Sequence, residues 1–482
     1  METISEQLIE LDNLRKQLAI NLKSMGVEAS ADESLKTLVP KVLDCKTDVI
    51  WSRSTVTGNI TNVNIPNGIT IIGDKAFYDC SSLKSTTIPD SVTSIGEAAF
   101  ASCTALTNIN VAENNLNYSD IDGVLFDKEI TELIQYPTGN TRTDYSVPDS
   151  VTSIGYAAFA SCTSLASITI PDSVTSIGEV AFYNCTSLAS IIIPDSVTSI
   201  GNYAFFGTPW LEAKRSENQL VIVNNILIDG TTCSGDVVIP DGVTTIGYAA
   251  FASCTALASI IIPDSVTSIG EAAFSGCTSL ASITIPDGVT IIGNSTFNNC
   301  TALTSVTIPD SVTSIGDKAF YKCTSLSSIT IPNSVASIGD EAFSGCTNLA
   351  SVNIPDSVTS IGNSTFNNCT ALASITIPDS VTSIGYMAFV KCRALTSIII
   401  PDSIISIGNS TFNNCTALAS IIIPDSVTSI GETAFYRCTS LANIYYKGTE
   451  EQWNAITKGS SWDTNMGSNV EGGTVITYNY TG

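Results

Sequence analysis

The chain has 482 residues and a formal net charge of −25, with 45 acidic side chains, 20 basic side chains and no histidine. This charge excludes a typical binder of nucleic acid or of anionic membrane, because both surfaces require dense Lys and Arg. The absence of histidine excludes Ser-His-Asp and Cys-His catalysis, and it excludes metal sites with imidazole ligands.

The composition predicts a folded chain without a membrane span. Hydrophobic residues make up 44% of the chain and charged residues only 13%, which is too apolar for a disordered protein. Apolar runs are too short to cross a bilayer. The N-terminus has no apolar signal-peptide core, so we expect no Sec export and reduced thiols at the fifteen cysteines.

Residues 1–46 are predicted to form a helical attachment or oligomerisation module. Apolar residues alternate four and three positions apart, as in a coiled-coil seam of three heptads. The candidate oligomerisation residues are Leu8, Leu11, Arg15, Leu18 and Leu22. Because three heptads are marginal alone, a monomeric helical hairpin packed on the rest of the chain and self-association, for instance as a homo-trimer, both stay open.

The heptads are followed by GVEAS at 26–30 and by ESLKTLVPKVLD at 33–44. This order resembles the short N-terminal module of many phage tail and baseplate-associated proteins. The resemblance implies a virion component whose N-terminal helices bind other tail proteins. Residues 47–64 are predicted to be an N-terminal cap and linker.

From 65 to 447 the chain repeats one unit of 23 residues. Eleven of the thirteen gaps between repeat prolines, from Pro66 to Pro424, are 23 residues long. Irregular units at 111–147 and 206–239 account for the other two gaps. A fixed period of this length indicates a solenoid in which each unit buries its apolar face on its neighbours. Residues 448–482 are predicted to form a C-terminal cap.

The unit at 280–297 shows how the repeat is expected to fold. Leu280, Ile283 and Ile285 have the L-x-x-L-x-L spacing of a leucine-rich repeat strand. The two isoleucines should point inward, because alternate side chains of a strand face opposite sides. Pro286 has no N–H group and should end the strand.

The rest of this unit should complete one turn of the solenoid. A second short strand is expected on the opposite wall, followed by one helical or 3₁₀ turn from Ser295 to Asn298 that places Phe297 in the core. The predicted fold class is therefore a leucine-rich repeat solenoid of parallel β-strands plus short helical or 3₁₀ turns, with a small N-terminal α-helical module.

Identical residues at one repeat position should form ladders along the solenoid. Thirteen cysteines, from Cys80 to Cys438, share one position, and parallel Cβ atoms about 4.8 Å apart are too distant for disulfides. We expect buried thiols that pack as small apolar side chains. The aspartates after the repeat proline provide too few oxygens at one point for calcium. No metal site, cofactor or catalytic residue is predicted.

Aromatic residues concentrate where the repeat breaks or ends. The candidate partner-binding residues are Tyr118, Tyr136, Trp210, Trp453, Trp462 and Tyr478. Two interpretations stay open: these side chains pack the irregular parts, or they contact protein or carbohydrate through rigid aromatic faces. The regular strand face has no charged or aromatic anchors, so we expect recognition at the irregular parts, chiefly at the C-terminal cap.

The unit sequence IPxSVTSIGxxAFxxCxxL resembles the Treponema-type, or BspA-like, leucine-rich repeat family throughout 65–447. The resemblance implies a non-enzymatic adhesive or binding scaffold displayed on a surface. Together with the N-terminal module, it predicts a phage tail fibre, receptor-binding or tail-tip protein of the virion that contacts a host cell-surface protein or glycan. The alternative is a bacterial BspA-like surface adhesin that binds protein or glycan outside the cell. Neither interpretation includes nucleic acid or a membrane span.

Overall fold

The computed structural model describes residue 16, residues 50–52 and residues 61–481. The predicted seam, Leu8, Leu11, Arg15, Leu18 and Leu22, lies outside the described residues, so the N-terminal helical module stays a prediction. The chain divides into two compact units, the first ending at Asn140 and the second beginning at Thr141.

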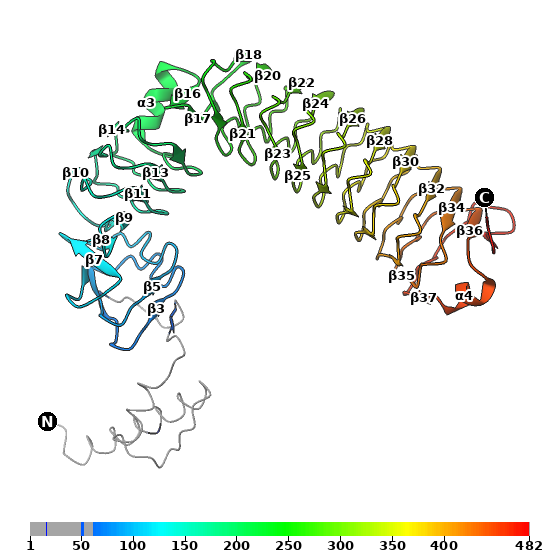
Figure 1. Ribbon diagram of the computed structural model, residues 1–482, viewed down its shortest axis with the longest axis horizontal. Coiled ribbons are helices and arrows are strands. Elements are labelled where there is room, and N and C mark those ends of the chain that lie inside the picture. The colour runs from blue at the N-terminus through cyan, green and yellow to red at the C-terminus, as the bar shows by residue number, and fades with distance from the viewer. Residues whose placement is uncertain (1–15, 17–49, 53–60, 482) are drawn as a thin grey trace. The chain divides into compact units, whose positions relative to one another are not determined.

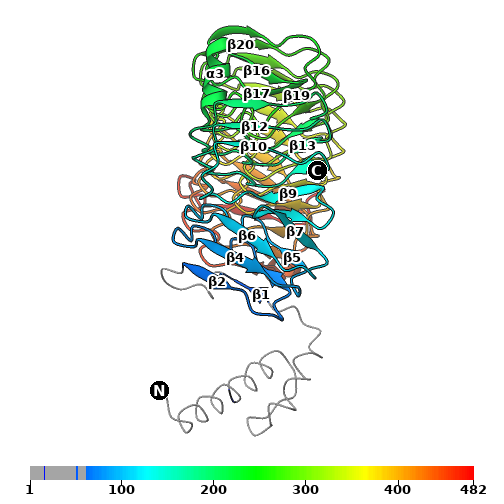
Figure 2. The same cartoon turned by 90° about the vertical axis from the view of Figure 1, so that its left-hand side faces the viewer.

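The first unit contains the first repeats and then an antiparallel sheet. Parallel strands of one wall are β2 (Asn62–Asn64), β4 (Ser85–Ile88) and β6 (Asn108–Val111), which lie side by side in Figure 2. Parallel strands of the opposite wall are β1 (Ile50–Trp51), β3 (Ile71–Ile72) and β5 (Ser94–Ile95). The irregular unit follows as the antiparallel strands β7 (Tyr118–Ile121), β8 (Val124–Asp127) and β9 (Glu132–Gln135).

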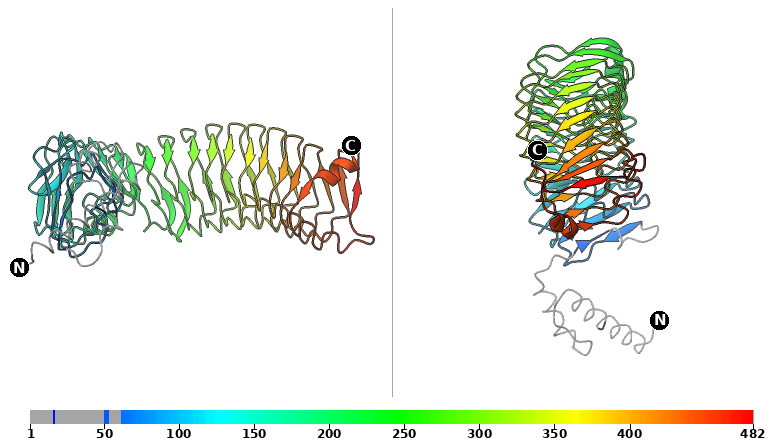
Figure 3. Two further views of the ribbon diagram at one scale, coloured as in Figure 1. Left: turned by 90° about the horizontal axis from the view of Figure 1, so that it is seen from below. Right: turned by 90° about the vertical axis from the view of Figure 1, so that its right-hand side faces the viewer.

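The second unit is a solenoid of parallel strands. Equivalent residues of successive repeats pair 23 positions apart, as Ser167 pairs with Ser190 and Ile168 with Ile191. Figure 1 and Figure 3 show the strands from β18 to β36 in one row that ends beside α4. Two walls of each repeat are strands, and the third is a segment of turns that we call the turn wall.

The long-strand wall carries the first strand of each repeat. Its members are β10 (Asp144–Ser146), β12 (Ser167–Thr169), β14 (Ser190–Ile192), β18 (Gly235–Val238), β20 (Leu257–Ile261), β22 (Ser282–Thr284), β24 (Ser305–Thr307), β26 (Ser328–Thr330), β28 (Ser351–Asn353), β30 (Ser374–Thr376), β32 (Ser397–Ile399), β34 (Ser420–Ile423), β36 (Asn443–Tyr446) and β38 (Val475–Thr477).

The short-strand wall lies opposite. Its members are β11 (Ser153–Ile154), β13 (Ser176–Ile177), β15 (Ser199–Ile200), β17 (Ile226–Asp229), β19 (Thr245–Ile246), β21 (Ser268–Ile269), β23 (Ile291–Ile292), β25 (Ser314–Ile315), β27 (Ser337–Ile338), β29 (Ser360–Ile361), β31 (Ser383–Ile384), β33 (Ser406–Ile407), β35 (Ser429–Ile430) and β37 (Thr457–Lys458).

The strand pattern predicted from the sequence is confirmed in the repeat at 280–297. Leu280, Ile283 and Ile285 are buried, while the alternating Ser282 and Thr284 are exposed. Ile291 and Ile292 form the short strand on the opposite wall. The chain is therefore a parallel leucine-rich repeat solenoid with the expected 23-residue period.

The predicted helical or 3₁₀ turn in each repeat is wrong. Ser295 and Asn299 have φ angles of 55° and 59°, in the left-handed region that interrupts a right-handed helix. The N–H groups of Ser295, Phe297 and Asn299 donate to carbonyls of the next repeat at N–O distances of 2.8, 2.8 and 2.7 Å. Because alternate N–H groups point toward the next repeat, this segment forms hydrogen bonds with the equivalent segment of that repeat, and the stacked segments make up the turn wall.

Within residues 61–481 the helices are α3 (Pro209–Glu217) and α4 (Glu450–Ala455), one in the irregular unit and one in the C-terminal cap. Neither of the two is long and apolar enough to span a bilayer. The regular repeats thus contain strands and turns alone in the part of the chain that the structure describes.

The core of the second unit is a stack of identical positions. Eight consecutive phenylalanine pairs, from Phe251–Phe274 to Phe412–Phe435, have ring centroids 5.2–5.6 Å apart and interplanar angles of 2–14°. The rings are almost entirely removed from solvent. Each ring therefore packs mainly on the rings of the two adjacent repeats, which makes the interior one aromatic column.

The ladder cysteines have a hydrogen-bonding role as well as a packing role. The thiol of Cys300 donates to the carbonyl of Phe274, and that of Cys323 donates to Phe297, both at 3.1 Å. Burial raises the pKa of Cys438 to about 12, so this thiol keeps its proton at neutral pH. Each such bond joins one repeat to the preceding one, which gives cysteine an advantage over alanine at this position.

Candidate functional site

The irregular unit at 206–239 interrupts the solenoid with α3 and with the hairpin of β16 (Val221–Val223) and β17. Helix α3 begins where Thr208 caps it, because the Thr208 hydroxyl accepts from the N–H of Leu211 at 3.1 Å. Trp210 then packs against Phe205 with ring centroids 4.8 Å apart. The tryptophan therefore covers the end of the phenylalanine stack of the preceding repeats.

The irregular unit has a turn wall two residues shorter than that of a regular repeat. Leu227 pairs with Ile246, so these positions are equivalent. Gly230 is equivalent to Phe251. The Gly230 N–H donates to the carbonyl of Ala250, and the Phe251 N–H donates to that of Ala273, which is the same position one repeat later. Gly230 follows Leu227 by three positions, whereas Phe251 follows Ile246 by five. The irregular turn wall therefore lacks two residues, and only its Gly230 N–H donates to the next repeat, where a regular turn wall has three such donors.

The shortened turn wall also leaves donors of the preceding repeat without their usual partners. In a regular repeat the N–H of Ala249 donates to Glu271 at 3.0 Å and that of Phe251 to Ala273 at 2.8 Å. Tyr203 and Phe205 hold the equivalent positions just before the irregular unit. Nowhere in the described residues does a backbone carbonyl accept a hydrogen bond from either N–H group.

Backbone acceptors are left open on the far side of the same gap. The carbonyl of Ala250 accepts from Gly230 at 2.6 Å, but the carbonyls of Tyr248 and Ala252 receive no backbone N–H from the described residues. Gly230 has no room for a side chain, because an added Cβ would collide with the Phe251 ring. The residues that carry these open donors and acceptors all line one space that the chain itself does not fill.

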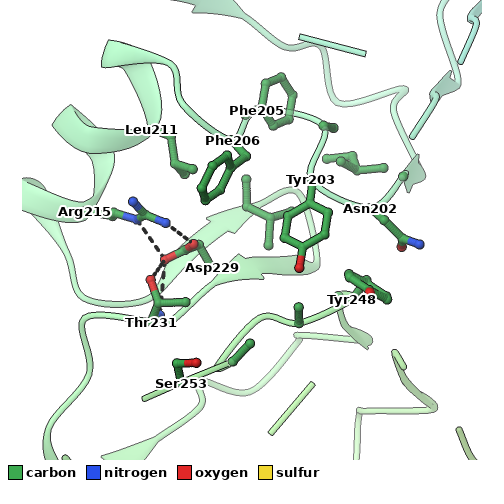
Figure 4. A pocket seen from close by; sticks show the side chains of 17 residues that line it. Asn202, Tyr203, Phe205, Phe206, Leu211, Arg215, Asp229, Thr231, Tyr248 and Ser253 are labelled. Carbon is green, nitrogen blue, oxygen red and sulfur yellow. Dashed lines mark hydrogen bonds and ion pairs between the residues drawn. The ribbon is translucent and has the colours of Figure 1, made fainter. Parts of the chain in front are cut away.

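This space is a pocket of about 250 Å³. The polar and aromatic lining residues that define its chemistry are labelled in Figure 4: Tyr203, Phe206, Arg215, Asp229, Tyr248 and Ser253. The pocket lies wholly within the second unit, between the turn wall that contains Tyr203 and the one that contains Tyr248. Its volume is that of a site for one small group, because ligand pockets usually start at about 300 Å³.

One side of the pocket is a neutralised ion pair. Arg215 donates to the carboxylate of Asp229 from Nε at 3.0 Å and from Nη2 at 2.6 Å, and from Nη1 to Glu212 at 2.5 Å. Thr231 donates to the same carboxylate from its N–H at 3.2 Å and from its hydroxyl at 2.9 Å. The Asp229 hydrogen bonds raise the pKa of Arg215, so the pair stays ionised and mutually bonded.

The other side of the pocket is aromatic. Tyr203 meets Phe206 edge-on at 5.7 Å and Tyr248 edge-on at 5.1 Å, and Phe206 stacks on Tyr183 at 5.5 Å. Tyr203 and Phe206 remain 44% and 41% exposed. Burial, with a contribution from the Tyr248 hydroxyl, raises the pKa of Tyr203, which therefore stays protonated as a hydrogen-bond donor. The cluster offers rigid, accessible ring faces.

The candidates of the first unit and of the irregular unit lie mostly in the interior. Tyr118 is half-buried and its hydroxyl accepts from the N–H of Ile95 at 2.9 Å, while Tyr136 is fully buried. Trp210 is buried beside the pocket, and its neighbour Leu211 contributes to the lining. The roles of these three aromatic residues as partner contacts stay predictions.

The candidates of the C-terminal end pack against one another. Trp453, only 4% exposed, meets Tyr446 edge-on at 5.2 Å and Trp462 edge-on at 6.2 Å. The ammonium of Lys458 lies 4.9 Å from the centre of the Trp453 ring. Trp462 and Tyr478 are half-buried against the core. These residues close the last repeat, and their contact role also stays a prediction.

The sequence pattern indicates the irregular unit and Trp210 as candidates, but it does not single out Tyr203, Tyr248, Arg215 and Asp229. The signal for them is the two-residue shortening, which appears only when the irregular unit is aligned on a regular repeat by its strand pairing. Over residues 50–52 and 61–481, no group of three or more His, Cys, Asp or Glu side chains could hold a metal ion.

Comparison with known proteins places the repeats in a family. The model of the BspA type leucine rich repeat region matches residues 55–137, 138–257, 230–350 and 336–457. Among proteins with curated functions, none matches this chain.

Solved structures also resemble the chain. A leucine-rich repeat protein from Bacteroides ovatus is 27% identical over 88% of this chain and 93% of its own, with a TM-score of 0.41. A leucine rich cell surface protein from Faecalibacterium prausnitzii is 29% identical over 83% and 91%, with a TM-score of 0.31. The T. pallidum leucine rich repeat protein is 38% identical over 34% and 78%, with a TM-score of 0.33.

Proposed function

Because this chain belongs to the BspA-type leucine-rich repeat family, we propose that it is a non-enzymatic recognition protein, a bacterial surface adhesin that binds protein or glycan outside the cell. The observation that carries the proposal is the pocket at the irregular unit. It is built from open backbone groups and exposed rings on a solenoid whose regular parts satisfy their own hydrogen bonds. A concave site with unpaired polar groups and exposed aromatic rings has the features of a binding site.

The outer face of the regular long-strand wall lacks the features of a specific binding site, which supports assigning recognition to the pocket. Its outward residues include Ile192, Ile261 and Ile399, which are exposed but flat and separated by threonines in other repeats. Such a surface lacks the aromatic and arginine anchors that dominate interface energies. The wall serves as a spacer that holds the pocket, and it adds at most weak contacts along its length.

The phage-tail interpretation receives no support here. It depends on residues 1–46, of which only Lys16 belongs to the described residues. The family match covers the repeats instead, and it favours the adhesin alternative. Trp453, Trp462 and Tyr478 remain a second candidate surface of the adhesin.

Labelling of intact source cells with antibodies against the repeats tests the location. We expect signal without permeabilisation and its loss after protease treatment of whole cells. Labelling that requires permeabilised cells, or that follows purified phage tails, would overturn the proposal. Binding of the full chain to immobilised mucin and matrix glycoproteins tests recognition, with serum albumin as the control surface; equal binding to albumin would count against it.

A further inference from the structure

We infer that the pocket between Tyr203 and Tyr248 binds one neutral sugar residue, the terminal hexopyranose of a glycan. The inference rests on the proposed recognition function and names its ligand class. Four properties of the described pocket support this ligand: its charge, its unpaired polar groups, its aromatic rings and the hydrogen bond from Gly230 to Ala250.

The charge of the pocket selects a neutral ligand. All the charge-bearing groups of Arg215 are bonded to carboxylates, two bonds to Asp229 and one to Glu212. The Asp229 carboxylate accepts four hydrogen bonds from Arg215 and Thr231. An anionic ligand would have to compete with Asp229 for the guanidinium, and a cationic ligand would have to compete with the guanidinium for Asp229. In either case the new ion pair would only replace the existing pair of Arg215 and Asp229, so a charged ligand gains no net ion pair.

The open backbone groups select a ligand rich in hydroxyls. The N–H groups of Tyr203 and Phe205 are donors without backbone partners, and the carbonyls of Tyr248 and Ala252 are the matching acceptors. A ligand that enters the pocket displaces water from these groups and must then supply partners of both kinds, because a buried polar group without a partner costs free energy. A hydroxyl is at once a donor and an acceptor. A sugar ring, with hydroxyls around its edge, can therefore bond to both sides of the gap, whereas a hydrocarbon ligand cannot.

The rings complete the match. Tyr203, Phe206 and Tyr248 form a connected aromatic cluster in the lining of the pocket, and Tyr183 extends it. Rigid ring faces give contact area to the C–H face of a sugar at little cost in conformational entropy. Tyr386 holds the position of Tyr248 in a regular repeat and is 53% exposed, but no gap lies beside it because the next repeat is complete.

An extended peptide fits the pocket less well. A peptide strand bonds through consecutive rungs of a ladder. The central rung is already closed, because the Gly230 N–H donates to the Ala250 carbonyl at 2.6 Å. The open groups on either side of it are isolated. A compact ring with separate hydroxyls can reach them, and a continuous strand cannot without displacing Gly230.

The test is saturation-transfer NMR of the full chain with methyl glycosides of glucose, galactose, mannose and N-acetylglucosamine. We expect transfer to at least one glycoside. The double variant Tyr203→Ala with Tyr248→Ala, and the pocket-filling variant Ala252→Trp, should each weaken that binding about tenfold or more. The controls are Tyr386→Ala and Ser275→Trp, which make the Tyr248→Ala and Ala252→Trp changes at equivalent positions of regular repeats and should bind as the parent chain does.

Circular dichroism and urea midpoints verify that every variant is folded. Should a pocket variant fail to fold, Phe206→Ala replaces it, because that ring is exposed. Three outcomes would overturn the inference: no glycoside binds, the pocket variants bind normally, or the controls lose binding as the pocket variants do. If the chain binds cells or mucin through the pocket while no glycoside competes and an extended peptide does, the sugar assignment fails but the adhesin proposal survives. Intracellular location would defeat the adhesin proposal while leaving glycoside binding measurable.

Discussion

The regular repeat that begins at Pro240 and the irregular unit before it use the same two strand walls but different third walls. In the repeat, the N–H groups of Ala249 and Phe251 donate to the next repeat, and the Phe251 ring joins the core column. In the irregular unit, Gly230 replaces that phenylalanine and the turn wall is two residues shorter. β17 and β18 still pair with β19 and β20. A solenoid can thus gain a pocket by losing two residues from one wall, because the other walls carry the stacking.

The largest expected effect concerns the cysteine ladder of the regular repeats. Burial raises the pKa of Cys103 and Cys438 to about 12, whereas an unfolded thiol has a pKa of about 8.5. Their contribution to stability is fully present below about pH 8.5 and is lost as the pH rises from there toward 12. Above about pH 8.5 the free energy of unfolding should fall with a slope that approaches about 1.4 kcal/mol per pH unit for each buried thiol. Urea titrations at pH 7.5, 8.5 and 9.5 measure this change, and most of it should lie between pH 8.5 and 9.5.

The control for the alkaline effect is a triple variant of the second unit. Replacing Cys300, Cys323 and Cys346 with alanine removes three buried thiols whose pKa is raised by burial. The variant should start less stable at pH 7.5 but lose stability less steeply with pH. Equal slopes for the two proteins would show that other groups, such as tyrosines, cause the alkaline loss.

A ring in the regular stack should matter far more than a ring at the pocket. Phe297→Ala removes a fully buried ring from the column and should cost about 3–5 kcal/mol. Phe206→Ala removes an exposed ring and should cost less than about 1 kcal/mol. Urea unfolding measures both. Hydrogen exchange should show the Phe297 variant losing protection first in the adjacent repeats, and uniform loss along the unit would contradict neighbour-limited stacking.

The ion pair beside the pocket should have an intermediate effect that stays local. Arg215→Met leaves the Asp229 carboxylate, about nine-tenths buried, without its guanidinium and should cost about 2–3 kcal/mol. Adding Asp229→Asn removes the unpaired charge and should restore part of this loss. Hydrogen exchange across 206–239 measures the change. A double variant no more stable than the single one would argue against the ion pair as the cause.

The smallest effect is expected on the outer face of the long-strand wall. Ile261 is 63% exposed, and the equivalent residue of the next repeat is Thr284. Ile261→Thr should change stability by less than about 0.5 kcal/mol, because the position packs on neither core nor pocket. A shift of the urea midpoint beyond that limit would mean that this isoleucine takes part in a contact within the solenoid.

Much of the regular repeat was predictable because its determinants are local. The spacing of Leu280, Ile283 and Ile285 selects the inward face of a strand, and Pro286 ends it. The period locates the two irregular units, since a break in a constant spacing is visible in the sequence alone. The turn wall was not predictable in the same way. Its left-handed residues, such as Ser295, are stabilised by carbonyls of the next repeat, which a single unit does not contain.

The sequence by itself determined the solenoid, its period, its core positions and the place where regularity fails. Only the tertiary structure decided what happens at that place. The chain distance between Leu227 and Gly230 has no meaning until β17 pairs with β19 and shows which residues are equivalent. Tyr203 and Tyr248 are 45 residues apart in the sequence. They become neighbours because the turn wall of the irregular unit between them is two residues shorter than a regular one. Stacking turns a local deletion into a gap between distant residues, and no single repeat can reveal a gap of that kind.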